Sequence, residues 1–395
     1  MIRATRTQWI KFAVVLALYL IFLVWLRSWL GLVVVPFIFD AYITKKIPWT
    51  WWRESKNRHV VTVMGWVDAI VFALVAVYFV NLYFFQNYVI PSSSLEKSLL
   101  TGDYLFVSKM SYGPRVPQTP LHMPLAQHTL PFFNCKSYLE HPQWDYKRVK
   151  GLGDVQLNDI VVFNFPAGDT VATGVPNDDI YRLSYGAGKE LAKPVDLASM
   201  TPEQQRVVYD YYYQLGREYL KENPQNFGEI ISRPVDRREN YVKRCVGLPG
   251  QTLEIKDRII YLDGKANKEP DNVQYRYLVK TKRPIPDDLA HELGISKEDM
   301  MMYYTDASVY NMPLTEKAKA GLLARKDIVV SIENTPADDA GGLYPLNMYK
   351  NWTTDNYGPV WIPKKGETVK LTIENLPVYE RPIHVYEGNE LAVKD

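Results

Sequence analysis

Cysteine and histidine are scarce in this chain, and neither is arranged as a metal site requires. The 395 residues include only Cys135 and Cys245, which are too few for a disulfide-rich scaffold or a four-thiolate zinc site. The six histidines show no HExxH-type spacing. We therefore expect neither a metal nor another cofactor. The two cysteines could pair in an oxidising compartment, and the sequence does not show how far apart they lie.

An excess of charge of one sign is also lacking. The 46 basic and 44 acidic residues leave a net charge of +2, which gives no electrostatic reason to expect a nucleic-acid partner. Hydrophobic residues make up 47% and charged residues 23% of the chain, so a wholly disordered protein is excluded.

Long apolar runs, by contrast, are present near the N-terminus. Between Phe12 and Phe39 the only charged residue is Arg27, and none lies between Ala69 and Phe85. Because a membrane helix needs about 20 mostly apolar residues, we expect spans at about residues 10–32 and 65–86. Buried core helices would show a polar face, and a signal peptide would end in a small-residue cleavage site; neither is found.

Basic residues flank the first expected span on both sides. The loop at 40–60 carries Lys45, Lys46, Arg53, Lys56 and Arg58, and the N-terminal tail carries Arg3, Arg6 and Lys11. The larger number in the loop favours a cytoplasmic loop. The N-terminus and everything after about residue 88 would then lie outside.

After residue 88, short β-rich runs alternate with Gly and Pro, which is typical of a mostly-β domain with irregular connections. The expected strands are Tyr104–Val107, Asp159–Phe165, Asn240–Val246, Arg258–Leu262 and Thr368–Ile373. A capping box at Thr201 predicts a helix to about Glu222, and Thr315–Arg325 predicts a second helix. We divide the chain into an anchor (1–88), a β core (89–166 and 237–256), a helical insertion (167–236) and an accessory β-rich region with a helical insertion (257–395).

Three short stretches carry the functional argument. They are PSSSLEKSL from Pro91 to Leu99, NDIVVFNFP from Asn158 to Pro166 and NYVKRCVGLPG from Asn240 to Gly250. Taken alone, serines after a membrane helix are typical of a solvated linker, and a Lys-Arg pair is typical of a strand edge. Within a strand, however, Tyr241, Lys243 and Cys245 share one face, so we expect Lys243 to sit between a ring and a thiol. A lysine kept neutral by burial is able to activate a serine.

Together, in this order, the stretches resemble the boxes of bacterial type I signal peptidases, membrane-bound Ser/Lys endopeptidases of the peptidase S26 family. Those boxes are Pro-Ser-x-Ser-Met-x-Pro-Thr-Leu, Gly-Asp-Ile-Val-Val-Phe-x-x-Pro and Tyr-x-Lys-Arg-x-Val-Gly-Leu-Pro-Gly. The resemblance implies a signal-peptidase-like β fold behind two membrane helices. It also implies that 89–166 and 237–256 form the catalytic core.

By the same resemblance, Ser94 is the nucleophile and Lys243 its general base. Ser92, through its hydroxyl, and Ser94, through its N–H, would form the oxyanion hole. Tyr241 would pack against the lysine, Arg244 would support it, and Asp159 would have a structural task at the start of a strand. The sequence departs from the family at Leu95, Lys97 and Ser98, which replace Met, Pro and Thr.

The family's last box, Gly-Asp-Asn-x-x-x-Ser with a following Asp-Ser-Arg, has no match in this sequence. The nearest stretch, Thr353–Gly358, lacks its first glycine and its serine. In the family this box supplies a serine that hydrogen-bonds the catalytic lysine and an aspartate in a supporting salt bridge. We therefore expect the accessory region to be incomplete at its C-terminus.

The resemblance implies that the substrates are secreted preproteins with Ala-x-Ala-type signal peptides. They would bind in extended form at an edge strand, with small side chains in shallow pockets near Val89, Ile90 and Leu95. The site would lie at the outer, periplasmic face of the bacterial inner membrane. Two alternatives remain: a relative that binds signal sequences or partner proteins without cutting, and a self-cleaving transcriptional repressor. The two spans and the lack of a basic DNA-binding domain argue against the second.

Overall fold

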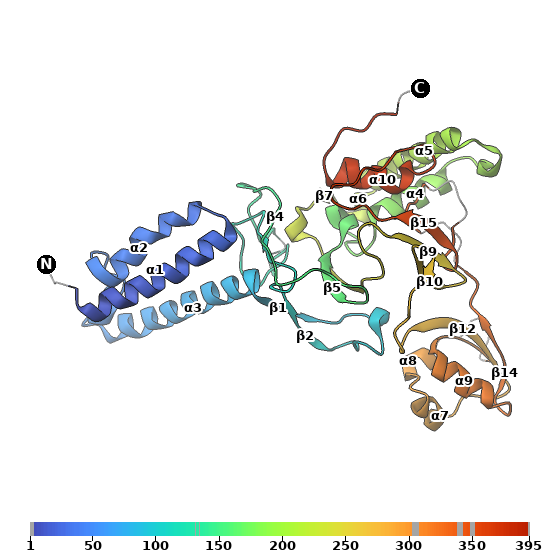
Figure 1. Ribbon diagram of the computed structural model, residues 1–395, viewed down its shortest axis with the longest axis horizontal. Helices are drawn as coiled ribbons and strands as arrows, with labels where there is room; N and C mark the ends of the chain where they lie inside the picture. Colours follow the sequence, from blue (N-terminus) through green and yellow to red (C-terminus); the bar gives the residue numbers. More distant parts are fainter. Residues whose placement is uncertain are drawn as a thin grey trace. The chain divides into compact units, whose positions relative to one another are not determined.

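The computed structural model describes residues 4–130, 132–133, 135–301, 308–337, 343–347 and 352–393 (Figure 1). Arg3, one of the basic residues of the tail, lies outside these ranges. The chain forms two compact units. The first contains residues 1–89, 104–155 and 234–238, and the second contains residues 90–103, 156–233 and 239–395.

Two helices of the first unit, α1 (Arg6–Leu26) and α3 (Arg58–Tyr83), are long and apolar enough to cross a membrane. Their limits differ from the expected ones. Helix α1 ends at Leu26 because Arg27 adopts a left-handed cap with a φ of 50°. Helix α3 begins earlier than predicted, because the side chain of Asn57 accepts a hydrogen bond from the backbone of His59 and so caps it.

A third apolar segment, Leu30–Thr44, runs back along α1 and contains α2 (Val35–Phe39) (Figure 1). Its start is fixed near the end of α1, since the Tyr19 hydroxyl donates to the Gly31 carbonyl at 2.7 Å. Its far part returns to the start of α1, where the Phe39 ring lies 5.4 Å from that of Phe12. The anchor therefore has three apolar helical segments, where the sequence analysis expected two.

Small sheets make up the rest of the first unit. Strand β1 (Phe85–Val89) pairs with β2 (Tyr104–Ser108), and β3 (Arg115–Val116) pairs with β4 (Lys147–Arg148), both antiparallel. The 3-10 turn η7 (Val235–Arg237) joins this unit from far along the chain.

The second unit holds the remaining strands. Antiparallel pairs are formed by β5 (Ile160–Asn164) with β8 (Asn240–Arg244), and by β6 (Thr170–Ala172) with β7 (Ile230–Ser232). A four-stranded sheet has the order β11-β10-β9-β15, formed by Lys265–Ala266, Ile259–Leu262, Thr252–Lys256 and Tyr357–Trp361. The helices of the second unit include α4 (Ile180–Leu191), α5 (Pro202–Glu222), α6 (Pro224–Phe227) and α10 (Leu376–Arg381).

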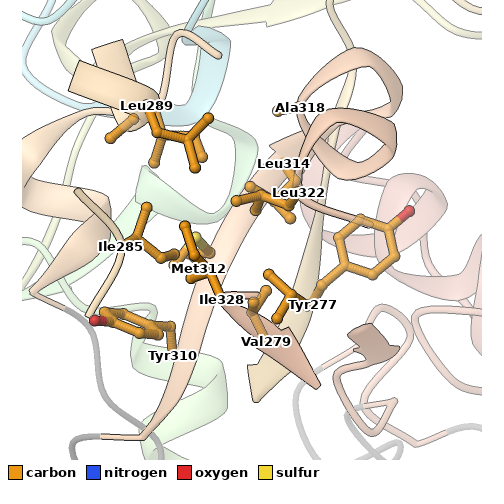
Figure 2. Packing of buried hydrophobic residues seen from close by; sticks show 13 residues of the cluster. Tyr277, Val279, Ile285, Leu289, Tyr310, Met312, Leu314, Ala318, Leu322 and Ile328 are labelled. Atoms are coloured by element: carbon orange, nitrogen blue, oxygen red, sulfur yellow. The ribbon is translucent and has the colours of Figure 1, made fainter. Parts of the chain in front are cut away.

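The accessory region contains a sheet with the order β13-β12-β14, formed by Val309–Thr315, Gln274–Thr281 and Val329–Asn334. Strand β13 alternates half-buried and buried residues throughout, as expected for a sheet with one covered face. Helices α7 (Asp287–Glu292), α8 (Lys297–Met300) and α9 (Glu316–Ala324) complete this region. Figure 2 shows its core, in which Val279, Met312 and Leu322 are fully buried.

The prediction of a mostly-β catalytic domain behind two membrane helices is not confirmed, because 39% of the chain is helical and only 19% is in strands. Helices of the anchor and of the insertion account for much of the difference. The strand expected at Thr368–Ile373 is wrong: these residues form an irregular segment leading to α10. The predicted capping box at Thr201 is present, and α5 and α9 lie where the sequence indicated.

Candidate active site

The serine-rich stretch forms a tight turn that presents Ser94 to solvent. Ser92 is extended, and a 3-10 turn follows at Ser93–Leu95. Backbone bonds close the surrounding loop, because Ile90 N–H donates to Asp103 O and Gly102 N–H donates to Ile90 O.

Lys243 reaches this serine from β8. Strand β8 pairs with β5 in a register that sets Lys243 opposite Val161 and Tyr241 opposite Phe163. From there the Lys243 Nζ donates a hydrogen bond to Ser94 Oγ at 2.7 Å. Two residues 149 positions apart in the chain are therefore in direct contact, with the geometry required of a nucleophile and its base.

The expected shielding of Lys243 is not found. The residue is exposed, because β5 and β8 form a sheet of only two strands that leaves the lysine side open. Tyr241 stacks on Phe165, with ring centroids 4.3 Å apart and planes within 5°, where we expected it against the lysine. Burial raises the pKa of the Tyr241 hydroxyl.

The turn also provides a backbone donor near the serine. The N–H of Ser94 lies in the first residues of a 3-10 turn, where backbone donors lack a partner within the helix. The side chain of Ser92 makes no capping bond with this turn. The oxyanion hole that the resemblance implies for Ser92 and Ser94 stays a prediction.

Arg244 connects the serine turn to the strand pair, a role that the sequence analysis described only as support. Its Nη2 donates to Ser98 Oγ at 2.9 Å, and its Nη1 donates to the Asn158 carbonyl at 2.8 Å. The contribution of Ser98 was missed. The only signal in the sequence was its position in the first box, at the family's threonine.

Asp159 lies in the turn just before β5. Its Oδ2 accepts from the Gln156 N–H at 2.8 Å, and its carbonyl accepts from the Cys245 N–H at 2.8 Å. These bonds tie the start of β5 to the end of β8, in line with the structural task expected of this residue.

An open cavity of about 850 Å³ lies beside Ser94. Its walls include Leu95 and Arg244, residues of β9 and β10, and the start of β12. Ile90 is only 3% exposed, so its side chain faces the interior, contrary to the expectation of an open pocket. Val89 is 51% exposed and belongs to the first unit.

The two cysteines are both free thiols. Among the residues described by the structure, no cluster of three His, Cys, Asp or Glu side chains is arranged to hold a metal ion.

Comparison with known proteins gives a family. The model of the family "Signal peptidase, peptidase S26" matches residues 63–292. Signal peptidase I P of Bacillus subtilis subsp. natto is 20% identical over 279 residues, which is 70% of this chain and 90% of that protein. Signal peptidase I of Helicobacter pylori is 42% identical over 56 residues, 14% of this chain and 18% of that protein. No solved structure matches the chain.

The family match covers more than half of the 395 residues and includes Ser94, Lys243 and both strands of the pair β5–β8. The three boxes found in the sequence all lie within it. The chain therefore belongs to the peptidase S26 family of signal peptidases.

Proposed function

We propose that this protein is a membrane-bound serine endopeptidase that removes signal peptides from exported preproteins with a Ser94–Lys243 dyad. The observation that carries the proposal is the 2.7 Å distance between Lys243 Nζ and Ser94 Oγ. The signal peptidases that match the chain supply the substrate class.

In the first step the neutral amine of Lys243 takes the proton of Ser94, and Oγ attacks the scissile carbonyl. The Ser94 N–H and the Ser92 hydroxyl donate to the resulting oxyanion. Lys243 then gives its proton to the departing amine, which leaves as the mature N-terminus. Water attacks the acyl-enzyme with Lys243 again as base, which releases the signal peptide and restores Ser94.

The proposed reaction steps require a neutral Lys243, although this residue is exposed in the free protein. Removing water from an ammonium favours its neutral form. We propose that the bound preprotein provides this cover, by lying in extended form along the open side of the pair β5–β8. Small residues of an Ala-x-Ala site would contact Leu95 at the cavity wall.

We propose an orientation with the N-terminus in the cytoplasm, which differs from the one expected from the sequence. Helices α1 and α3 end together, since the Phe22 ring lies 5.1 Å from that of Phe79 and Trp25 contacts Tyr83. Leu30–Thr44 returns to the start of α1, so the basic tail and the basic loop share one side. The positive-inside rule makes that side cytoplasmic and the second unit periplasmic.

Thiol labelling of intact spheroplasts tests this orientation. In a Cys135→Ser, Cys245→Ser background, we expect Ala4→Cys and Ser55→Cys to react with an impermeant maleimide only after lysis. Val207→Cys on α5, which is 70% exposed, should react before lysis. Labelling of Ala4→Cys in intact cells would contradict a cytoplasmic N-terminus.

Cleavage assays test the dyad. The purified chain in detergent is incubated with a preprotein bearing an Ala-x-Ala site, beside Ser94→Ala, Lys243→Ala and the matched control Ser93→Ala. We expect cleavage by the wild type and the control, and none by the two dyad variants. Cleavage by Ser94→Ala would refute the mechanism. Signal-peptide binding without cleavage by any form would favour the non-cutting alternative.

A further inference from the structure

A hairpin in the first unit carries an unusual stretch of sequence. Between Arg115 and Lys136 there is no Asp, Glu, Lys or Arg. Cross-strand backbone bonds join the two arms of a hairpin, with the Leu139 N–H donating to Leu121 O and the Met123 N–H donating to Ser137 O. We call the described residues 121–130, 132–133 and 135–139 the apolar hairpin.

Its large apolar side chains point into solvent in the isolated chain. Their exposed fractions are 51% for Leu121, 53% for Met123, 76% for Leu125, 102% for Phe132, 78% for Phe133 and 60% for Leu139. A group of exposed apolar side chains on one element marks a surface that binds a membrane or another protein.

Buried charges fix the base of the hairpin. The carboxylate of Asp236 accepts hydrogen bonds from the backbone N–H groups of Gln118 and Thr119, both at 3.0 Å. Arg237, only 4% exposed, donates to Thr119 Oγ1 and to the Gln127 carbonyl. The guanidinium also lies 5.4 Å from the centre of the Tyr138 ring. The apolar hairpin is therefore held in one position, although its tip is exposed.

That position is against helix α3. The Tyr78 hydroxyl donates to the Pro120 carbonyl at 3.3 Å, and the Tyr78 ring lies 4.8 Å from that of His122. Tyr78 precedes the last residue of α3 by five positions, which at a rise of 1.5 Å per residue is about 7.5 Å. Counted from the last residue of α3, this distance is similar to the roughly 5–10 Å by which interfacial segments enter a membrane.

We propose that the apolar hairpin inserts its exposed side chains into the bilayer leaflet at the end of α3, as a fourth membrane contact of this protein. The lipid surface is favoured over a protein partner because no Asp, Glu, Lys or Arg lies between Leu121 and Cys135, and because the hairpin contacts α3, which is apolar enough to cross a membrane. The inference rests on α3 crossing the bilayer and is independent of the cleavage chemistry.

Spin-label depth measurements on the full chain in proteoliposomes test the proposal. In the Cys135→Ser, Cys245→Ser background, nitroxides are placed at Phe133→Cys and Leu125→Cys. Phe72→Cys, 75% exposed within α3, is the membrane control, and Val207→Cys, 70% exposed on α5, is the aqueous control. We expect both hairpin labels to collide with oxygen more often than with a nickel chelate, as the α3 label does.

Two results would overturn the proposed membrane contact of the apolar hairpin. If both hairpin labels match position 207 while position 72 is in lipid, the hairpin stays in water. If they become protected from the nickel chelate only when a signal peptide is added, the hairpin is a docking surface for substrate. If the label at position 72 lies in water, α3 does not cross the bilayer and the inference fails, whatever the result of the cleavage assay.

Discussion

The accessory sheet β13-β12-β14 and the strand pair β5–β8 are built in opposite ways. The sheet buries Val279, Met312, Leu322 and Ile328 completely beneath its helices (Figure 2). The pair leaves Lys243 exposed and contacts the serine turn through individual hydrogen bonds, from Lys243 to Ser94 and from Arg244 to Ser98. Apolar packing fixes the first region, whereas directional polar bonds fix the second. Substitutions should therefore separate stability from activity.

The largest effect is expected for Lys243→Met, which removes the proposed general base but no buried contact. The kcat/KM of preprotein cleavage should fall by about 10³-fold or more. The free energy of unfolding should change by about 0.5 kcal/mol or less, since the residue is exposed. Cleavage rates and thermal unfolding of the same preparations provide the measurement. If Lys243→Met lowered the free energy of unfolding as well as the rate, the strand pair β5–β8 would be held by packing.

Met312→Ala should lower the stability of the protein without lowering its activity. Loss of this fully buried side chain should lower the free energy of unfolding by about 2–5 kcal/mol, through lost burial and the cavity left behind. Cleavage by the molecules that remain folded should be unchanged. Denaturant unfolding in detergent measures the effect, and Val330→Ala, an exposed residue of β14 (52%), is the matched control.

Arg244→Gln tests the polar connection to the serine turn. Without the bonds of Arg244 to Ser98 and Asn158 the proposed nucleophile Ser94 would shift, and a misplacement of about 1 Å costs roughly 100-fold in rate. We expect kcat to fall by about 10- to 100-fold with little change in KM. Arg244→Lys should recover only part of the rate, because an ammonium does not reproduce the two-pronged guanidinium. A change in KM alone would assign Arg244 to substrate binding.

Lys109→Met extends the comparison to a half-buried charge in the first unit. Burial and the charge of Arg115 lower the pKa of Lys109 to about 8. The unfolded chain therefore binds more protons between about pH 8 and pH 10.4, so the wild type gains stability as pH rises through this range. The variant should be more stable by roughly 1–3 kcal/mol at pH 7, and the gain should disappear near pH 10.4. Thermal unfolding at both pH values measures this, and a pH-independent gain would contradict it.

Local signals in the sequence predicted several elements correctly. The capping box at Thr201 and the apolar run at Ala69–Phe85 depend on nearby residues, which is why α5 and α3 were expected close to their observed positions. The span expected at about residues 10–32 ends earlier, at Leu26, because the left-handed conformation of Arg27 separates α1 from the apolar segment Leu30–Thr44. The strand expected at Thr368–Ile373 failed because a strand exists only where a partner pairs with it.

Inspection of the sequence was enough to find the three boxes, the apolar anchor, and the serine and lysine proposed as the dyad. These are properties of neighbouring residues, and chain geometry imposes them locally. Only the tertiary structure decided that Lys243 contacts Ser94 across 149 positions while staying exposed, that Leu30–Thr44 turns back along α1, and that Asp236 and Arg237 hold the apolar hairpin. Exposure and long-range contact depend on what the rest of the chain places beside a residue, which local pattern does not specify.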